Sequence, residues 1–125
     1  MPILLDLLLV VPALLIAVTV HEYSHGKVAD LLGDPTPCHS GRLSLNPLSH
    51  LDFLGSLMIF LVHIGWAKPV PINPNYFKDP NRGMMYVGLA GPLSNLVMAF
   101  LAAFPLRVGL VVPHSLLYFV FLYII

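Results

Sequence analysis

The sequence predicts an all-α integral membrane protein with about three transmembrane helices, one short re-entrant helix and a small extended or β element. Composition is the first reason, since 58% of residues are apolar, only 10% are charged and the mean hydropathy is +0.86. A chain of this kind is suited to a lipid bilayer. The second reason is that the apolar residues gather into four segments, Ile3 to Val20, Leu54 to Ala67, Met84 to Phe104 and Leu106 to Ile125.

The lengths of the segments decide how each is expected to lie. A bilayer core of about 30 Å needs about 20 helical residues, which the first and third segments supply. The second, Leu54 to Ala67, has only 14 residues and is therefore predicted to be re-entrant. Pro113 breaks the fourth. The first helix is expected to continue through Leu32 and to stop at Gly33, a residue typical of helix ends.

Charge placement supports the same topology. If the second segment only half crosses, five cations fall on one face, which is cytoplasmic by the positive-inside rule, and Arg107 lies opposite. These five are Lys27, Arg42, Lys68, Lys78 and Arg82. The formal net charge of zero gives no sign of a nucleic-acid partner, and the lone Cys38 excludes an internal disulfide.

Two stretches between the apolar segments predict non-helical backbone. Residues Gly41 to Pro47 alternate polar and apolar side chains as a strand does, and Ala67 to Pro74 carries too many prolines for a central strand. Such backbone is tolerated at membrane depth only against protein or a watery cavity. We therefore expect the two stretches to line a cavity.

The motif that points to a chemical function, zinc binding with a catalytic base, is His21-Glu22-Tyr23-Ser24-His25. Glu22 is the only glutamate in the chain. On a helix, His21 and His25 project from one face about one turn apart, close enough to share Zn²⁺. Glu22 lies on the neighbouring flank, where it can accept a proton from water as a catalytic base. The alternative is that these residues fell together by composition.

Several motifs in order resemble the site-two protease family of intramembrane zinc metalloproteases, over essentially the whole chain. The matching stretches are His21 to Gly26, Gly41 to Pro47, Gly65 to Pro71 and Gly91 to Asn95. The resemblance implies that His21 and His25 bind zinc, that Glu22 is the catalytic base, and that Asn95 is a polar site residue. It also implies cleavage of transmembrane helices of other proteins.

The chain departs from the family's pattern at the third zinc ligand. In the family this ligand is an aspartate in a later Leu-Asp-Gly-like segment, and no such segment occurs here. The sequence is therefore expected to be truncated. Residues 1–125 are expected to form the N-terminal part of a membrane-embedded protease core. Within the chain, Asp52 is a weak candidate for the third ligand, with His50 beside it, if the re-entrant segment folds back.

The expected function is an intramembrane zinc metalloendopeptidase of a prokaryotic cell membrane, a multi-pass protein whose partners are the lipid bilayer and a transmembrane protein substrate. Edge-on pairing with an extended substrate would compensate for the hydrogen bonds lost on unwinding. The residues expected to bind substrate are Asn95, Arg42, Leu43, Ser44, Leu45 and Asn46. The alternatives are a non-catalytic metal- or haem-binding membrane protein and an inactive fragment that acts as an interaction module.

Overall fold

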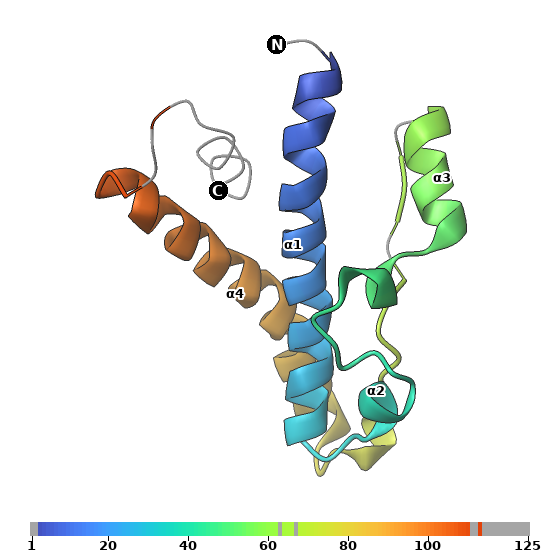
Figure 1. Ribbon diagram of the computed structural model, residues 1–125. Coiled ribbons are helices and arrows are strands. Elements are labelled where there is room, and N and C mark those ends of the chain that lie inside the picture. The colour runs from blue at the N-terminus through green and yellow to red at the C-terminus, as the bar shows by residue number, and fades with distance from the viewer. Residues whose placement is uncertain (1–2, 63, 67, 111–112, 114–125) are drawn as a thin grey trace.

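The computed structural model describes residues 3–62, 64–66, 68–110 and 113. Two long helices, α1 (Ile3–Leu31) and α4 (Pro80–Arg107), dominate it and make the most extensive contact between elements. They lie together through the C-terminal half of α1 and diverge beyond it (Figure 1). The smaller elements are α2 (Thr36–His39), η1 (Pro47–His50), α3 (Phe53–Val62) and η2 (Pro74–Tyr76). The expectation of a mostly helical fold is confirmed.

Helix α1 carries the His-Glu motif in its interior, as expected, and ends where Gly33 predicts. Its 29 residues extend over about 44 Å at about 1.5 Å per residue. Gly33 adopts φ 105°, a left-handed conformation that favours glycine, and the Asp34 N–H donates to the Ala29 carbonyl at 2.9 Å. These two features form a Schellman-type helix end, which satisfies carbonyls that the helix leaves unpaired.

Helix α4 contains the whole of the third predicted segment. The Asp79 side chain accepts a hydrogen bond from the Arg82 N–H at 3.2 Å, and Pro80 occupies the first turn, where its missing N–H costs nothing. Phe77, just before the helix, is buried with Ala29 of α1 and Val87 of α4. This small core ties the start of α4 to the C-terminal half of α1.

An extended segment, residues 68–73, runs back towards α4 alongside α1, and we call it the strap. The Lys68 N–H donates to the His50 carbonyl at 2.8 Å, and the Asn73 N–H donates to the Asp34 carboxylate at 2.7 Å. Prolines at 69 and 71 supply no donor, which suits a chain that does not pair in a sheet. The strap agrees with the extended chain expected for Ala67 to Pro74 over residues 68–73. Pro74 instead begins η2, and Ala67 lies outside the described residues.

The strand predicted for Gly41 to Pro47 is wrong: apart from one bridge residue, Leu51, the described part of the chain contains no strand pairing. Local hydrogen bonds turn the segment instead. The Ser44 hydroxyl accepts from the Asn46 N–H at 3.0 Å, and the Asn46 side chain caps η1 by accepting from the Leu48 N–H at 3.1 Å. Side chains of Ser and Asn that bond nearby backbone compete with sheet formation in this way.

The structure describes most of the second apolar segment but little of the fourth. Helix α3 has ten residues and covers the second segment from Leu54 to Val62. The Asp52 carboxylate accepts the Gly55 N–H at 2.9 Å at the start of α3, and the helix is too short to cross a bilayer. The chain at Trp66 returns against Gly55, so α3 and this return form a hairpin (Figure 1). Most of the fourth segment, Leu106 to Ile125, lies outside the described residues.

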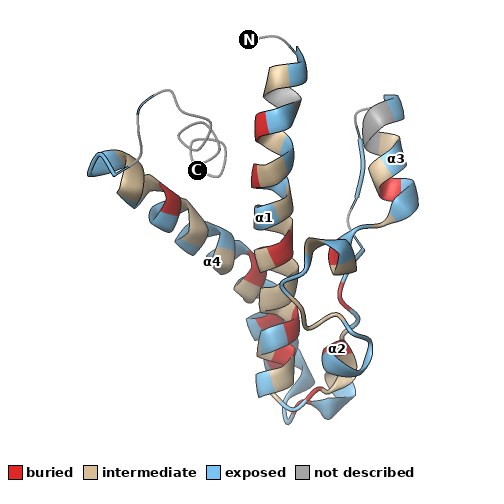
Figure 2. Ribbon diagram, viewed as in Figure 1, coloured by how far each residue is buried: buried red, intermediate tan, exposed pale blue. Residues whose placement is uncertain are grey.

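Two helices, α1 and α4, are long and apolar enough to span a membrane. Only 19% and 17% of the residues in their most apolar stretches are buried (Figure 2). A core helix of a water-soluble protein would have most of this surface covered. The exposed apolar surface therefore needs lipid or another apolar cover.

Candidate metal centre

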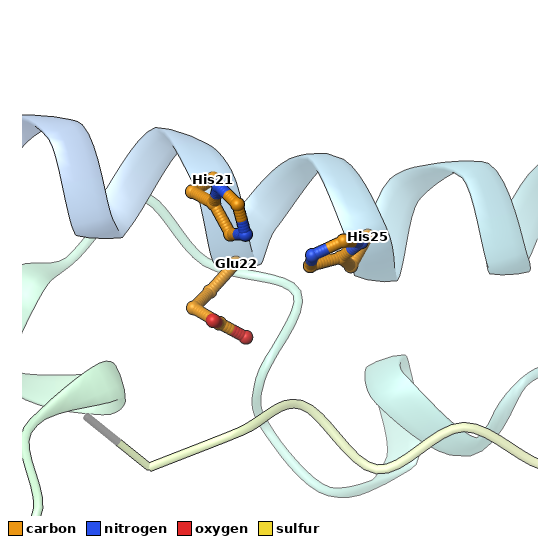
Figure 3. Close-up of side chains that lie close together, drawn as sticks. All are labelled: His21, Glu22 and His25. Atoms are coloured by element: carbon orange, nitrogen blue, oxygen red, sulfur yellow. The ribbon is translucent and has the colours of Figure 1, made fainter. Parts of the chain in front are cut away.

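His21 and His25 project from successive turns of α1 with their rings edge to face (Figure 3). The ring centroids are 4.6 Å apart and the ring planes make an angle of 81°. Potential ligand atoms of His21, Glu22 and His25 all lie within 4.8 Å of one another, and all three residues are half-buried. The helical spacing of the motif thus produces the expected cluster.

Helix α4 fixes the tautomer of His25. The His25 Nδ1 lies 2.5 Å from the Val87 carbonyl oxygen, which can only accept a hydrogen bond. The proton is therefore on Nδ1, and Nε2 keeps the lone pair that a metal needs. Sequence reasoning missed this contact, because a backbone carbonyl carries no signal in its residue type.

Asn95 lies two helical turns from Val87 on α4 and meets the other imidazole. Its side-chain amide is 2.9 Å from the Nδ1 of His21, with the amide nitrogen placed nearest. A half-turn of the amide exchanges nitrogen for oxygen, which then accepts the Nδ1 proton and leaves Nε2 free for metal. The structure thus places the predicted site residue Asn95 against a predicted metal ligand.

Gly91, between these two contacts, leaves room at the imidazole nitrogens. A Cβ built on Gly91 would lie 2.5 Å from His25 Nε2 and 2.6 Å from His21 Nε2. Since Zn–N bonds are about 2.0–2.1 Å long, the space that a methyl group would fill is close to the size of a coordinated ion. The arrangement of two Nε2 atoms around this gap fits a zinc ion.

Glu22 lies on the flank of α1 that faces the strap, beside the imidazoles (Figure 3). Its Oε2 accepts a hydrogen bond from the Val70 N–H at 3.2 Å. A cavity of about 330 Å³ opens at the cluster and is lined by Leu14, Ala17, Val18, His21, Glu22 and Asn95. His21 and Glu22 of the candidate metal group therefore face an open cavity.

Asp52, the in-chain candidate for a third ligand, is not brought to this group. Its carboxylate caps α3, and the only metal-type cluster found among the described residues consists of His21, Glu22 and His25. His50 is fully buried, with Nε2 2.8 Å from the Ser44 carbonyl, so it is a packing residue of the loop.

The residues predicted to pair with substrate make local contacts, and two of them, Leu43 and Leu45, lie beside α1. The Arg42 guanidinium donates to the Ser49 carbonyl, and the Leu43 side chain approaches Gly26. Leu45 is largely exposed beside Pro47 and residues 16, 19 and 20 of α1. Their substrate role remains a prediction, without the strand on which it was based.

The sequence is similar to that of a Bacillus subtilis (strain 168) protein named "Putative zinc metalloprotease YwhC". The two are 44% identical over 91 residues, which make up 73% of this chain and 42% of that protein. No family model matches the chain, and no solved structure matches it. The similarity supports metalloprotease chemistry, in agreement with the His21–Glu22–His25 cluster.

Proposed function

We propose that this chain carries the zinc-binding helix and the catalytic base of an intramembrane metalloendopeptidase, which cleaves transmembrane segments of other membrane proteins. The proposal rests chiefly on one observation, the grouping of ligand atoms from His21, Glu22 and His25 within 4.8 Å. The similarity to a protein named as a zinc metalloprotease supports it.

The roles of the side chains follow from their positions. When bound, zinc polarises the scissile carbonyl and makes water a stronger nucleophile near neutral pH. His21 and His25 would hold the ion through Nε2, because Asn95 and Val87 contact their Nδ1 atoms. Glu22 takes a proton from the attacking water and then passes it to the leaving amine. Two imidazoles are one protein ligand fewer than a catalytic zinc usually has, and by family resemblance an aspartate completes the set.

The shape of the surface around the site supports a hydrophobic substrate. An apolar groove of about 150 Å³ lies between α1 and the α3 hairpin and is lined by residues including Trp66, Leu51 and Gly65. Leu14 and Val18 line both this groove and the cavity at the metal cluster. A substrate segment that lies along α1 would thus contact both the apolar groove and the cavity at the imidazoles.

The bilayer is the proposed environment, in a prokaryotic cell membrane. The exposed apolar surfaces of α1 and α4 support this location. Of the cations assigned to the cytoplasmic side, Lys27 lies near the C-terminal end of α1 and Arg82 in the first turn of α4, while Arg107 ends α4 at its other end. This placement agrees with the topology expected from the positive-inside rule.

Substitution of Glu22 by Gln tests the proposal. In detergent-solubilised protein, we expect E22Q to retain metal, measured by elemental analysis, but to lose cleavage of fluorescent transmembrane peptides by about 10²–10⁴-fold. Ser24→Ala is a matched control on the same helix, because the Ser24 hydroxyl bonds the Val20 carbonyl away from the cluster. Full cleavage by E22Q would refute the hydrolase, and bound metal without any cleavage by the wild type would favour a non-catalytic metal protein.

A further inference from the structure

Within the described part of the chain, the carboxylate of Glu22 accepts one backbone hydrogen bond, and prolines flank its donor. The donor is the N–H of Val70, 3.2 Å from Oε2. Pro69 and Pro71 stand on either side of it, and proline has no N–H. Among residues 69 to 71, Val70 is therefore the only one with a backbone N–H. This N–H donates a hydrogen bond to the single glutamate of the chain.

The Val70 side chain holds this donor in place. Val70 is only 8% exposed, and its Cγ1 lies 3.3 Å from the position that a Cβ on Gly26 would occupy. The Pro37 Cβ and the Leu43 Cδ1 lie 3.3 and 3.5 Å from the same position, so these side chains line a notch at Gly26. Gly26 follows the motif directly, so the absence of its side chain lets the strap pack against the helical turn that carries Glu22.

The two ends of the strap are also fixed. The Lys68 N–H bonds the His50 carbonyl at 2.8 Å, and the Asn73 N–H bonds the buried Asp34 at 2.7 Å. With Val70 seated on Gly26 between them, the strap is held at three points along its length. Its backbone is therefore fixed relative to α1 at the position of Glu22.

We propose that Val70 is a positioning residue for the catalytic base, its backbone N–H holding the Glu22 carboxylate beside the imidazole pair. This inference rests on the proposed hydrolase function. A free glutamate side chain samples several rotamers, whereas one hydrogen bond to Oε2 restricts them and leaves Oε1 to accept the proton of the attacking water. The prolines keep other backbone donors of the strap away from the carboxylate.

Replacing the Val70 amide by an ester is the sharpest test, because it removes the N–H and keeps the side chain in the Gly26 notch. Cell-free synthesis of the full chain with α-hydroxyvaline at position 70 would provide this variant, while Val70→Pro is simpler but also empties the notch. We expect kcat on a fluorescent transmembrane peptide to fall about tenfold or more, since hydrogen bonds to charged groups are the stronger ones, with KM and zinc content unchanged. An ester at Ile72 is the matched control, because Ile72 packs on the Ala29–Phe77–Val87 core.

A second readout separates this proposal from the hydrolase function. Because Glu22 is the only glutamate, ¹³C-glutamate labelling gives one side-chain carboxylate signal in NMR. The Val70 ester should change the chemical shift of this signal, and the Ile72 ester should not. An unchanged signal, or an undiminished kcat in the Val70 ester, would overturn the positioning role. If the Val70 ester changes the signal but the wild type cleaves no peptide, the contact would be supported and only the hydrolase function refuted.

Discussion

At the scale of single residues, the main feature of the site is that α4 contacts both imidazoles through positions four residues apart. Val87, Gly91 and Asn95 lie on one face of α4 and provide, in order, a carbonyl for His25, space at both Nε2 atoms, and an amide for His21. Outer contacts of this kind commonly fix the orientation of metal-ligating histidines. Two helices thus build the candidate metal centre, although both candidate histidine ligands come from α1.

Gly91→Ala should reduce metal binding strongly. The new methyl group would lie 2.5 Å from His25 Nε2 and 2.6 Å from His21 Nε2, which is closer than any real contact and falls where an ion would bind. Titration of the detergent-solubilised protein with Co²⁺, followed by visible absorption, would measure the loss. Gly88→Ala is the matched control, because its Cβ meets nothing within 4 Å, and it should bind Co²⁺ as the wild type does.

Asn95→Leu should weaken zinc binding by about 10–100-fold, the usual effect of losing a hydrogen bond to a ligating histidine. Asn95→Asp should largely retain zinc, because a carboxylate accepts the Nδ1 proton of His21. Competition with a fluorescent zinc chelator would give the affinities. If Asn95→Leu bound zinc normally and changed only the KM for a peptide, Asn95 would be a substrate residue, as first expected.

The motif residues could be predicted from sequence because a helix fixes the relation between positions four apart. The contacts of Val87, Val70 and Gly91 could not, since they depend on how α4 and the strap lie against α1. The repeated spacing of Val87, Gly91 and Asn95 was the available signal, but it gains meaning only when the partner helix is known.

At the scale of the elements, side-chain caps and helix ends determine where each helix begins and stops. Asp79 before α4, Asp52 before α3, and Asn46 and Asn73 before the two 3-10 turns all accept backbone hydrogen bonds. The buried Asp34 carboxylate accepts two backbone hydrogen bonds, from the Thr36 N–H at 2.9 Å and from the Asn73 N–H at 2.7 Å. It thereby joins the end of α1 to the strap.

The ionisation of Asp34 should make the fold sensitive to acid. Burial raises the pKa of Asp34, but hydrogen bonds from the Thr36 hydroxyl and from the backbone of Asn73 and Thr36 outweigh it and hold the pKa below its ordinary value. A folded pKa below the unfolded value of about 3.9 means that the stabilisation is complete above that value. It is lost as the pH falls below about 4 and through the folded pKa.

Asp34→Asn should therefore be less stable than the wild type at neutral pH, by about 1–3 kcal/mol, because one of the two backbone donors loses its acceptor. Its thermal unfolding should also change less between pH 5 and pH 3. Melting curves in detergent at several pH values would show this, with Asp79→Asn, an exposed cap residue, as the comparison. Parallel loss of stability in the wild type and Asp34→Asn below pH 4 would contradict the assignment.

At the scale of the whole molecule, two long apolar helices meet through part of their length and leave most of their apolar surface uncovered. The loops, α2 and the strap gather around the C-terminal half of α1, at the end of α1 where α4 begins (Figure 1). The His21–Glu22–His25 group lies in α1 where these parts meet, next to polar and backbone groups rather than among apolar residues alone.

The topology can be tested with the single cysteine, Cys38, which is exposed on α2. A membrane-impermeant maleimide should label Cys38 from the cytoplasmic side, that is, in inverted membrane vesicles but not in intact cells. A Cys38→Ser, Val108→Cys double variant should show the reverse pattern, because Val108 follows α4 at the end that carries Arg107. Labelling of both positions from one side would contradict the proposed crossing of α4.

The sequence by itself determined the helical, apolar character of the chain, the end of α1 at Gly33 and the grouping of His21, Glu22 and His25, because these depend on composition and on spacing within one helix. Local hydrogen bonds of Ser44 and Asn46 turn Gly41 to Pro47, although its alternating pattern predicted a strand. Tertiary structure alone decided that Asn95 meets His21 and that Val70 meets Glu22. These contacts join residues 48 to 74 positions apart, and no local pattern fixes how such distant segments pack.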